Sequence, residues 1–329
     1  MLFIDNKGIT DPRVNLAIEE YALKNLDVNE TYLLFYINEP SIIIGKNQNT
    51  IEEINTDYVE SNGIRVVRRL SGGGAVYHDL GNLNFSFITK DDGESFHNFR
   101  KFTEPVIAAL QKLGVNAELS GRNDIEVGGK KISGNAQFST RGRMFSHGTL
   151  MLNSEVDNVV SALKVKKEKI ESKGIKSVRS RVANISDYLS EKMMIEEFRA
   201  LLLRSIFDDA EEIPEYVLSD DDWTKIHQLS KERYQNWEWN YGKSPKFNLQ
   251  HSHRFPVGSI DVRLEVNKGT IENCKIYGDF FGVGDVSEIE NKLIGSRYEK
   301  SELEMALIDV DTHHYFGNIS KEEFINLIY

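Results

Sequence analysis

Residues 68–79 read Arg-Arg-Leu-Ser-Gly-Gly-Gly-Ala-Val-Tyr-His-Asp. Three successive glycines carry no Cβ and adopt positive φ at little cost, so their backbone N–H groups can come close to a bound anion. Arg68 and Arg69 add permanent charge and planar forks of donors that fit carboxylate and phosphate oxygens. The stretch therefore predicts an anion-binding loop, with a glycine-rich hairpin that binds nothing as the alternative.

The segments on either side of the glycines predict a strand, a loop and a second strand. Ile64, Val66 and Val67 form the apolar run of a buried strand, and the chain returns to extended structure at residues 75–77. No helix follows the loop, and the Gly-Lys-Ser/Thr ending of a P-loop is missing. The loop is therefore neither an ordinary P-loop nor a dinucleotide-binding turn.

A second group of polar residues lies further along the chain. Residues 121–125 read Gly-Arg-Asn-Asp-Ile, and residues 128–137 read Gly-Gly-Lys-Lys-Ile-Ser-Gly-Asn-Ala-Gln. The paired glycines predict a hairpin that presents Asp124 and one lysine from neighbouring strands. A carboxylate can hold Mg²⁺, and an ammonium can neutralise charge around a transferring phosphoryl group. We assign this role to Lys131, which precedes small residues that leave space for a ligand, and expect Lys130 to be a solvated surface lysine.

Together these segments resemble the motifs of lipoate-protein ligases, the ATP-dependent enzymes that attach lipoic acid to lysines of lipoyl carrier domains. The family pattern runs Arg-Arg-x-Ser-Gly-Gly-Gly-Ala-Val-x-His-Asp-x-Gly-Asn, then Gly-Arg-Asn-Asp, Lys-Ile-Ser-Gly-x-Ala and His-Gly-Thr-Leu. These motifs occur here, in order, at residues 68–82, 121–124, 131–136 and 147–150. Residues 15–20, Asn-Leu-Ala-Ile-Glu-Glu, resemble the family's first helix, so the similarity covers most of residues 1–250.

The resemblance implies a reaction in two steps. The lipoate carboxylate attacks the α-phosphorus of ATP and releases pyrophosphate, which gives the mixed anhydride lipoyl-AMP. The ε-amine of an acceptor lysine then attacks this anhydride. The implied substrates are lipoate and ATP with Mg²⁺, and the implied acceptors are lipoyl carrier domains of 2-oxoacid dehydrogenase complexes or the glycine cleavage H protein.

The resemblance also implies which residues form the site. The family's catalytic lysine precedes Ile-Ser-Gly, which corresponds to Lys131 and not to Lys130. Asp124 is the implied Mg²⁺ ligand. The residues implied to bind ATP and lipoyl-AMP are Arg69, Gly72, Gly73, Gly74, Ala75, Val76, Tyr77, Asp124 and Lys131. Those implied to bind lipoate are Gly73, Gly74, Lys131, His147 and Gly148. Two alternatives stay open. Residues 75–77 could be a plain core strand, and His147 could have a structural role.

The position of the single cysteine separates this chain from related acyltransferases. Octanoyl transferases of the same superfamily work through an acyl-cysteine and need a thiolate in the site. Cys274 lies outside all four motifs, between Ile271 and Ile276, which predicts a buried structural thiol. Biotin ligases usually carry Gly-Arg-Gly-Arg-x-Gly-Arg in their loop, so biotin is the weaker acid to propose.

Composition favours a cytoplasmic enzyme with a protein acceptor. The chain has 329 residues, of which 40% are hydrophobic, enough to build real cores in roughly two domains. The 40 basic and 51 acidic residues give a net charge of -11. Nucleic acid is not expected as the main partner, because phosphate neutralisation needs a basic face. We see no secretory signal and no run that approaches a membrane span, so we expect no membrane association.

The order of the predicted elements favours a two-domain α+β fold with mixed or antiparallel sheets and flanking helices, like that of biotin/lipoyl ligase catalytic domains. Helices are expected at residues 12–24, 52–61 and 99–113, and strands at residues 32–37, 41–45, 64–69, 83–89, 115–119 and 145–152. After an aromatic stretch at residues 234–241, strands at 247–254, 259–266 and 270–277 precede helices at 286–293, 301–307 and 321–328. We expect a catalytic domain over residues 1–243 and a small α+β accessory domain over residues 246–329.

Two other functions stay open at this point. One is an ATP-independent amidotransferase that moves lipoyl or octanoyl groups between carriers, and the other is a non-catalytic module that holds a lipoyl or nucleotide ligand. An intact Lys131 and Asp124 favour the ligase, because a pure binder has less need of a mobile ammonium beside a metal carboxylate. The basic run at residues 164–169 is expected to be a solvated segment or, alternatively, a guide for an acidic carrier domain.

Overall fold

The computed structural model describes residues 1–164, 181–242 and 247–329, which divide into two compact units. The first unit contains Met1–Ile44, Ile51–Arg68 and Ala75–Asn240, and the second contains Gly45–Thr50, Arg69–Gly74 and Tyr241–Tyr329. Residues 165–169 of the basic run and residues 243–246 after the aromatic stretch lie outside the described residues. The triple-glycine segment therefore belongs to the second unit.

A seven-stranded mixed sheet forms the centre of the first unit. Its strand order is β1-β2-β6-β10-β9-β8-β7, with β1 parallel to β2 and the other described pairs antiparallel. The strands are β1 (Leu2–Asp5), β2 (Tyr32–Ile37), β6 (Asn82–Lys90), β10 (Arg143–Met151), β9 (Lys130–Thr140), β8 (Asp124–Val127) and β7 (Glu118–Ser120). Side chains alternate along β6, so Phe85 and Phe87 share one face and Ser86 lies on the other.

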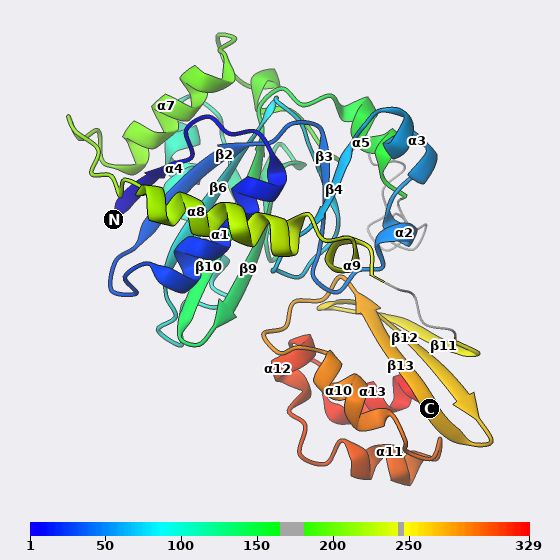
Figure 1. The fold of residues 1–329 in the computed structure, drawn as a ribbon. Helices are drawn as coiled ribbons and strands as arrows, with labels where there is room; N and C mark the ends of the chain where they lie inside the picture. Colours follow the sequence, from blue (N-terminus) through cyan, green and yellow to red (C-terminus); the bar gives the residue numbers. More distant parts are fainter. Residues whose placement is uncertain (165–180, 243–246) are drawn as a thin grey trace. The chain divides into compact units, whose positions relative to one another are not determined.

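Helices cover both faces of this sheet (Figure 1). Helix α1 (Pro12–Asn25) contacts β6 and β10 and packs beside α8 (Asp220–Leu229). On the opposite face, α4 (Phe99–Lys112) packs against α7 (Ile195–Ile206). These two helices and the sheet enclose the main core, which includes Phe35, Phe85, Phe87, Phe102, Val106, Phe198 and Leu202. Within the described residues, none of the helices has the length and apolar character needed to cross a bilayer.

Helix α1 has the bounds that the sequence predicts, to within one residue. The Asp11 side chain accepts the N–H of Arg13, and Pro12 occupies the first turn. The helix is buried on all sides between Val14 and Leu23, and that span includes two adjacent glutamates. Because a buried carboxylate needs a partner, each of these glutamates must be matched by a donor from another element.

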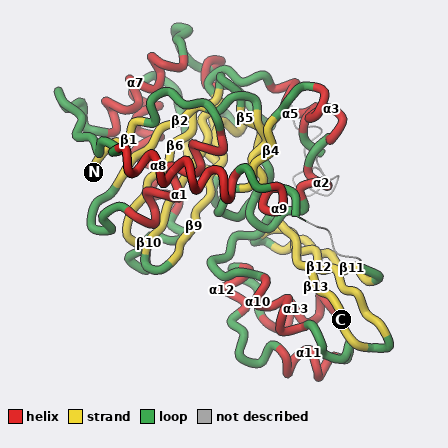
Figure 2. Tube along the Cα trace, viewed as in Figure 1, coloured by secondary structure: helices red, strands yellow, loops and turns green. Residues whose placement is uncertain are grey.

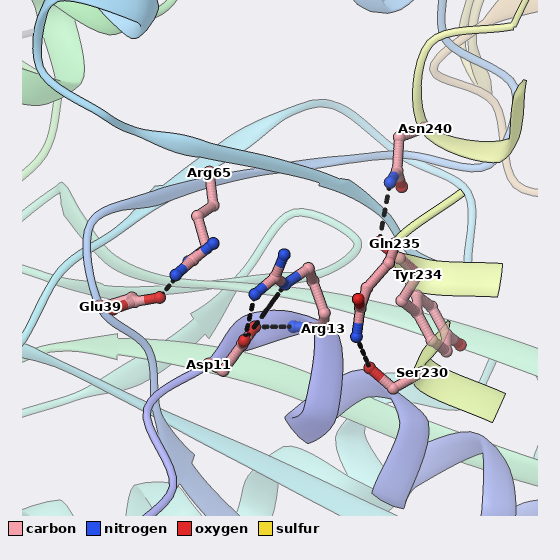
Figure 3. Close-up of polar contacts among 8 residues, drawn as sticks. All are labelled: Asp11, Arg13, Glu39, Arg65, Ser230, Tyr234, Gln235 and Asn240. Atoms are coloured by element: carbon pink, nitrogen blue, oxygen red, sulfur yellow. Dashed lines mark hydrogen bonds and ion pairs between the residues drawn. The ribbon is translucent and has the colours of Figure 1, made fainter. Parts of the chain in front are cut away.

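A smaller sheet carries the segments that enter and leave the glycine loop. Strand β3 (Ser41–Ile44) lies between β4 (Arg65–Arg68), which is parallel to it, and β5 (Val76–His78), which is antiparallel. The loop thus joins two strands that flank a third strand, and it is not the turn of a hairpin. At the start of β4, Arg65 forms an ion pair with Glu39 (Figure 3).

The pattern at residues 52–61 predicts a single helix. This prediction is wrong, because the structure has two short helices in this region. Helix α2 (Thr50–Glu53) ends before α3 (Thr56–Ser61) begins. The physical reason is Asn55, whose side chain accepts the N–H of Tyr58 and caps a new helix.

Several elements have no counterpart among the sequence predictions. They include β1, α7 and α8, together with α5 (Val156–Ala162), η1 (Ile185–Asp187), α9 (Trp237–Asn240) and α12 (Thr312–Phe316). The strand expected at residues 115–119 begins only at Glu118. Its predicted start is wrong because the N–H of Val115 bonds to the carbonyl of Leu110 and continues the end of α4.

The last residues of the first unit form hydrogen bonds with the end of β4. Helix α8 continues into a π-helical turn, η2 (Ser230–Tyr234), before α9. Asn240 Nδ2 donates to the carbonyl of Tyr234 at 2.8 Å (Figure 3), and its Oδ1 accepts the N–H of Arg68 at 2.9 Å. Strand β4 is therefore anchored at the residue that precedes the glycine loop.

The carboxy-terminal part of the second unit has the predicted order of strands followed by helices. Strands β11 (Leu249–Phe255), β12 (Gly258–Asn267) and β13 (Thr270–Gly278) form an antiparallel sheet. They precede α10 (Ser287–Leu293), α11 (Lys300–Ala306), α12 and α13 (Lys321–Ile328), as Figure 2 shows. Alternate residues of β12 meet these helices in a separate core, which includes Ile260, Val262, Leu264, Ile289, Leu303 and Phe324.

Candidate functional site

A β-bulge decides which way Lys131 faces. The pairing of β8 with β9 is regular up to Ile125 and shifts by one residue at Glu126, which stands opposite Lys131. In a regular ladder Lys131 would stand opposite Val127, on the buried face of the hairpin. The extra residue moves Lys131 to the other face, which Glu126 shares with Asp124.

On that face Lys131 and Asp124 form an ion pair. The distance from Lys131 Nζ to Asp124 Oδ1 is 2.7 Å, and Arg181 approaches the other carboxylate oxygen, Oδ2, at 3.2 Å. The Asp124 side chain is only 13% exposed and that of Lys131 23% exposed, so the ion pair is largely shielded from water. The predicted approach of Asp124 and one lysine is confirmed, and so is the exposure of Lys130 at the turn.

Gly134 provides the space that Lys131 occupies. A Cβ at position 134 would lie 2.7 Å from Lys131 Nζ and 3.0 Å from its Cε. The N–H of Gly134 donates to Thr149 Oγ1 at 3.1 Å, which ties this part of β9 to β10. The small residue that was expected to leave room for a ligand therefore leaves room for the lysine itself.

Asn123 attaches the Gly-Arg-Asn-Asp segment to β9. Its Nδ2 donates to the carbonyl of Asn135 at 2.6 Å, while Asn135 donates back from its N–H at 2.9 Å and from its Nδ2 at 3.0 Å. These bonds extend the β8–β9 pairing beyond Asp124. The carboxylate is thus held on a fixed backbone.

His147 is held by a buried carboxylate from α1. Its Nδ1 lies 2.9 Å from Glu19 Oε1, and both side chains are buried. The strand register places His147 opposite Ser86, whose buried hydroxyl has no hydrogen-bond partner among the described residues. His147 therefore has the fixed orientation of a structural histidine and lies beside an unsatisfied polar group.

Within the second unit, Arg69 organises the glycine loop from inside. Its guanidinium donates to the carbonyls of Gly72 and Gly74 at 2.7 and 2.8 Å, and its Nε donates to Ser71 Oγ at 2.9 Å. Gly73 has a φ of +89°, in the left-handed region that favours glycine. A charged side chain and a positive φ together set the shape of the loop.

The loop glycines are packed too closely to carry side chains. A Cβ on Gly72 would lie 2.4 Å from the carbonyl oxygen of Phe280, and one on Gly73 would lie 2.7 Å from the ring of Phe281. The N–H of Gly73 reaches the Phe280 carbonyl oxygen at 3.4 Å, which is a long hydrogen bond. In this conformation the predicted anion-binding amides therefore lie against residues 280–281 of their own unit.

The predicted site residues are divided between the two units. Arg69 and the three loop glycines belong to the second unit, whereas Lys131, Asp124 and His147 belong to the first. Ala75 and Val76 are half-buried beside β3. Tyr77 is buried, and this burial raises the pKa of its hydroxyl.

The single cysteine is structural, as the sequence predicts. Cys274 lies in β13 within the core of the second unit, and burial raises the pKa of its thiol to about 12. A thiol with this pKa is almost entirely protonated at neutral pH and makes a poor nucleophile.

Comparison with known proteins gives the family. Residues 11–207 match the lipoyl protein ligase A/B catalytic domain, and residues 244–328 match the bacterial lipoate protein ligase C-terminus. The lipoate-protein ligase LplJ of Bacillus subtilis is 73% identical over 331 residues, which cover 100% of each chain. The chain belongs to the lipoate-protein ligase family. Its resemblance to that family is thereby confirmed.

Two solved structures share the predicted α+β fold. Lipoate-protein ligase A bound with ATP superposes with a TM-score of 0.61 at 31% identity, covering 74% of this chain and 97% of that chain. P. falciparum LipL1 in complex with lipoate superposes with a TM-score of 0.78 at 22% identity, covering 99% and 97%. The fold of the ligase is therefore shared along almost its whole length.

The sequence reasoning missed two residues that this ligase places next to its motifs. Arg181 lies 57 positions from Asp124 along the chain, and no local pattern pairs the two. Glu19 had a usable signal, because it lies among the apolar residues of the predicted first helix. A carboxylate that such a helix buries requires a partner, and that partner is His147.

Proposed function

We propose that this ligase activates lipoate with ATP and transfers the lipoyl group to a lysine of a lipoyl carrier domain, with Lys131 as its catalytic residue. The observation that carries the proposal is the Lys131 ammonium, which lies over Gly134 beside the Asp124 carboxylate. The 73% identity to the Bacillus subtilis ligase supports the overall reaction. The relative with bound ATP supports ATP as the second substrate.

In the first step the lipoate carboxylate attacks the α-phosphorus of ATP, the bond to the bridging oxygen breaks, and pyrophosphate leaves with that oxygen. Both reactants are anions that repel each other, so a cation is needed between them. Lys131 leaves Asp124 and donates to carboxylate and phosphate oxygens, where it neutralises the charge that develops.

In the second step the uncharged ε-amine of the acceptor lysine attacks the lipoyl carbonyl carbon. The carbon–oxygen bond to the phosphate breaks, AMP leaves, and the new amide nitrogen loses its proton to solvent. Lys131 stabilises the phosphate oxygen as it departs. One ammonium thus serves both steps.

We assign the binding of ATP and lipoyl-AMP to Arg69, to the amides of the loop glycines and to residues 75–77 of the following segment. The internal bonds of Arg69 support this assignment, because they fix the shape of a loop whose glycines place no Cβ between the backbone amides and a ligand. Asp124 and Lys131 complete this set of residues.

Asp124 is the residue that would hold Mg²⁺ beside the phosphates. A single carboxylate suits this ion, because Mg²⁺ usually keeps several waters and takes substrate phosphates as its other ligands. The described residues contain no group of three or more His, Cys, Asp or Glu side chains that could hold a metal by themselves. When bound, the ion would neutralise charge on the pyrophosphate leaving group.

We assign lipoate binding to His147, Gly148, Lys131 and the loop residues Gly73 and Gly74. The fixed His147 ring and the unsatisfied Ser86 hydroxyl opposite it support a polar anchor in the middle of the sheet. Enclosing the lipoate chain would contribute about 0.8 kcal/mol for each buried methylene and would keep water from the anhydride.

The remaining assignments complete the proposal. The acceptors are lipoyl domains of 2-oxoacid dehydrogenase complexes or the glycine cleavage H protein. Residues 1–243 form the catalytic domain and residues 246–329 the accessory domain. A cytoplasmic location is supported by the single cysteine, which permits no internal disulfide.

The test is the lipoate-dependent exchange of labelled pyrophosphate into ATP. Wild-type protein should exchange label only when lipoate is present. Lys131→Ala should remove exchange while circular dichroism and the unfolding midpoint stay near wild type, because the side chain is partly exposed. Lys130→Ala is the matched control and should keep most of the activity. Exchange by Lys131→Ala at the wild-type rate would disprove the assigned role.

A further inference from the structure

Asp124 holds two cations in different ways. Lys131 Nζ contacts Oδ1 through a long flexible side chain, whereas the Arg181 guanidinium contacts Oδ2. If Lys131 departs toward a substrate before Mg²⁺ occupies Oδ1, the largely buried carboxylate loses one of these two cations. A carboxylate with little exposure to water is unstable without a compensating charge. The departure of Lys131 therefore costs free energy.

Arg181 is placed so that it stays behind when Lys131 moves. The N–H of Lys131 donates to the carbonyl of Arg181 at 2.8 Å, and the N–H of Ala183 donates to the carbonyl of Lys131 at 3.0 Å. These bonds form a short parallel bridge between Lys131 and Val182. Because the bridge involves backbone atoms alone, movement of the lysine side chain leaves the position of Arg181 unchanged.

We propose that Arg181 is a positioning residue, which compensates the Asp124 carboxylate and so releases Lys131 to the reacting anions. It acts through Asp124 and touches neither substrate. The inference rests on the proposed role of Lys131. It extends that role by identifying what makes the lysine available.

The first test measures how firmly Asp124 holds Lys131, without any turnover. Native protein is treated briefly with acetic anhydride, and peptide mass spectrometry gives the ratio of Lys131 to Lys130 acetylation. In Arg181→Gln the carboxylate depends more strongly on the lysine, so the ratio should fall by about three-fold. Asp124→Asn should raise it. If Arg181 only maintained local structure, its loss would loosen the segment and the ratio would stay constant or rise, which would overturn the proposal.

The chain offers a matched control for this measurement. Arg199 contacts Asp5 at the same distance, 3.2 Å, and both arginine side chains are 29% exposed. Arg199→Gln should therefore change neither the acetylation ratio nor pyrophosphate exchange. A ratio that fell equally in this variant would mean that the effect is nonspecific and would also contradict the proposal.

The second test is a double-mutant cycle on kcat/KM for ATP in pyrophosphate exchange. Arg181→Gln should lower kcat/KM by about ten-fold, and Arg181→Lys should restore much of the loss. In the Asp124→Asn background the same Arg181 change should have less than about a two-fold effect, since its partner is gone. Equal losses in both backgrounds would exclude action through Asp124. A failure of lipoate-dependent exchange in wild type would instead refute the ligase function and leave the acetylation result standing.

Discussion

The Lys131 ammonium lies where any residue other than glycine at position 134 would place its Cβ. The two atoms would be 2.7 Å apart, well inside contact distance. The obstacle is the far end of a flexible side chain, so an added methyl group displaces the lysine and leaves the backbone in place. Because of this relationship, a change at position 134 can move the Lys131 amine without destabilising the fold.

We therefore expect Gly134→Ala to lower lipoate-dependent pyrophosphate exchange by about ten-fold or more, because Lys131 loses its place beside Asp124. The free energy of unfolding should change by less than about 1 kcal/mol. Exchange assays and urea unfolding of the same preparation check both points. A variant that unfolds easily, or one with full activity, would contradict this prediction.

Gly148→Ala, in contrast to Gly134→Ala, should destabilise the fold. A Cβ at position 148 would lie 2.1 Å from Asn135 Oδ1 and 2.5 Å from the ring of Phe85, and both neighbours are buried in the sheet. Overpacking of this kind costs about 1–3 kcal/mol. Thermal unfolding should show a clearly lower midpoint than that of Gly134→Ala. An equal midpoint for the two variants would contradict this prediction, because it would mean that the sheet accommodates the added methyl group without a loss of stability.

The buried bond between Tyr234 and Glu20 should contribute strongly to stability. The Tyr234 hydroxyl donates to Glu20 Oε2 at 2.7 Å, and burial raises the pKa of that hydroxyl well above its usual value. Tyr234→Phe removes a donor from a carboxylate with no exposure to water and should cost about 1–3 kcal/mol. Tyr58→Phe is the control, since its bond to Asn158 is only partly buried and its loss should cost less. Urea denaturation curves compare the two.

Asp222 should make the stability of the ligase depend on pH. Burial raises its pKa, but hydrogen bonds from Tyr21, Ser219 and Tyr216 outweigh this effect and bring the pKa below the usual 3.8. The unfolded state then binds more protons, so the carboxylate stabilises the fold above about pH 4 and this contribution is lost as the pH falls through the folded pKa.

Unfolding of wild type and Asp222→Asn should be compared at pH 6 and pH 3. The difference in unfolding free energy should be largest at pH 6 and should shrink at pH 3. A difference that stayed constant would mean that the carboxylate makes no net charge-dependent contribution.

Cys274 should be unreactive in the native protein and dispensable for catalysis. Burial raises the pKa of its thiol to about 12, so iodoacetamide at pH 8 should alkylate it slowly until urea unfolds the chain. Cys274→Ser should retain most of the pyrophosphate exchange. Loss of exchange in a folded Cys274→Ser sample would reopen an acyl-cysteine route.

Local signals in the sequence were sufficient for many elements. The cap at Asp11 with its first-turn proline located α1, and the glycine pair at 128–129 located the β8–β9 hairpin, because both signals act within a few residues. Helices α2 and α3 were merged because the cap at Asn55 interrupts an otherwise helical pattern. Helices α7 and α8 are not among the predicted elements, although the capping box at Ser219 that begins α8 is also a local signal.

The sequence predicts the family, the two-part fold and the structural nature of Cys274, and its motifs single out Lys131 as the lysine to which we assign catalysis. Each of these depends on motifs, composition or short-range periodicity. The tertiary structure alone decided that a bulge turns Lys131 toward Asp124, that Arg181 shares that carboxylate, and that Glu19 orients His147. These relationships join residues that are distant along the chain. Their energies come from burial and pairing of charge, which exist only once the strands and helices have packed.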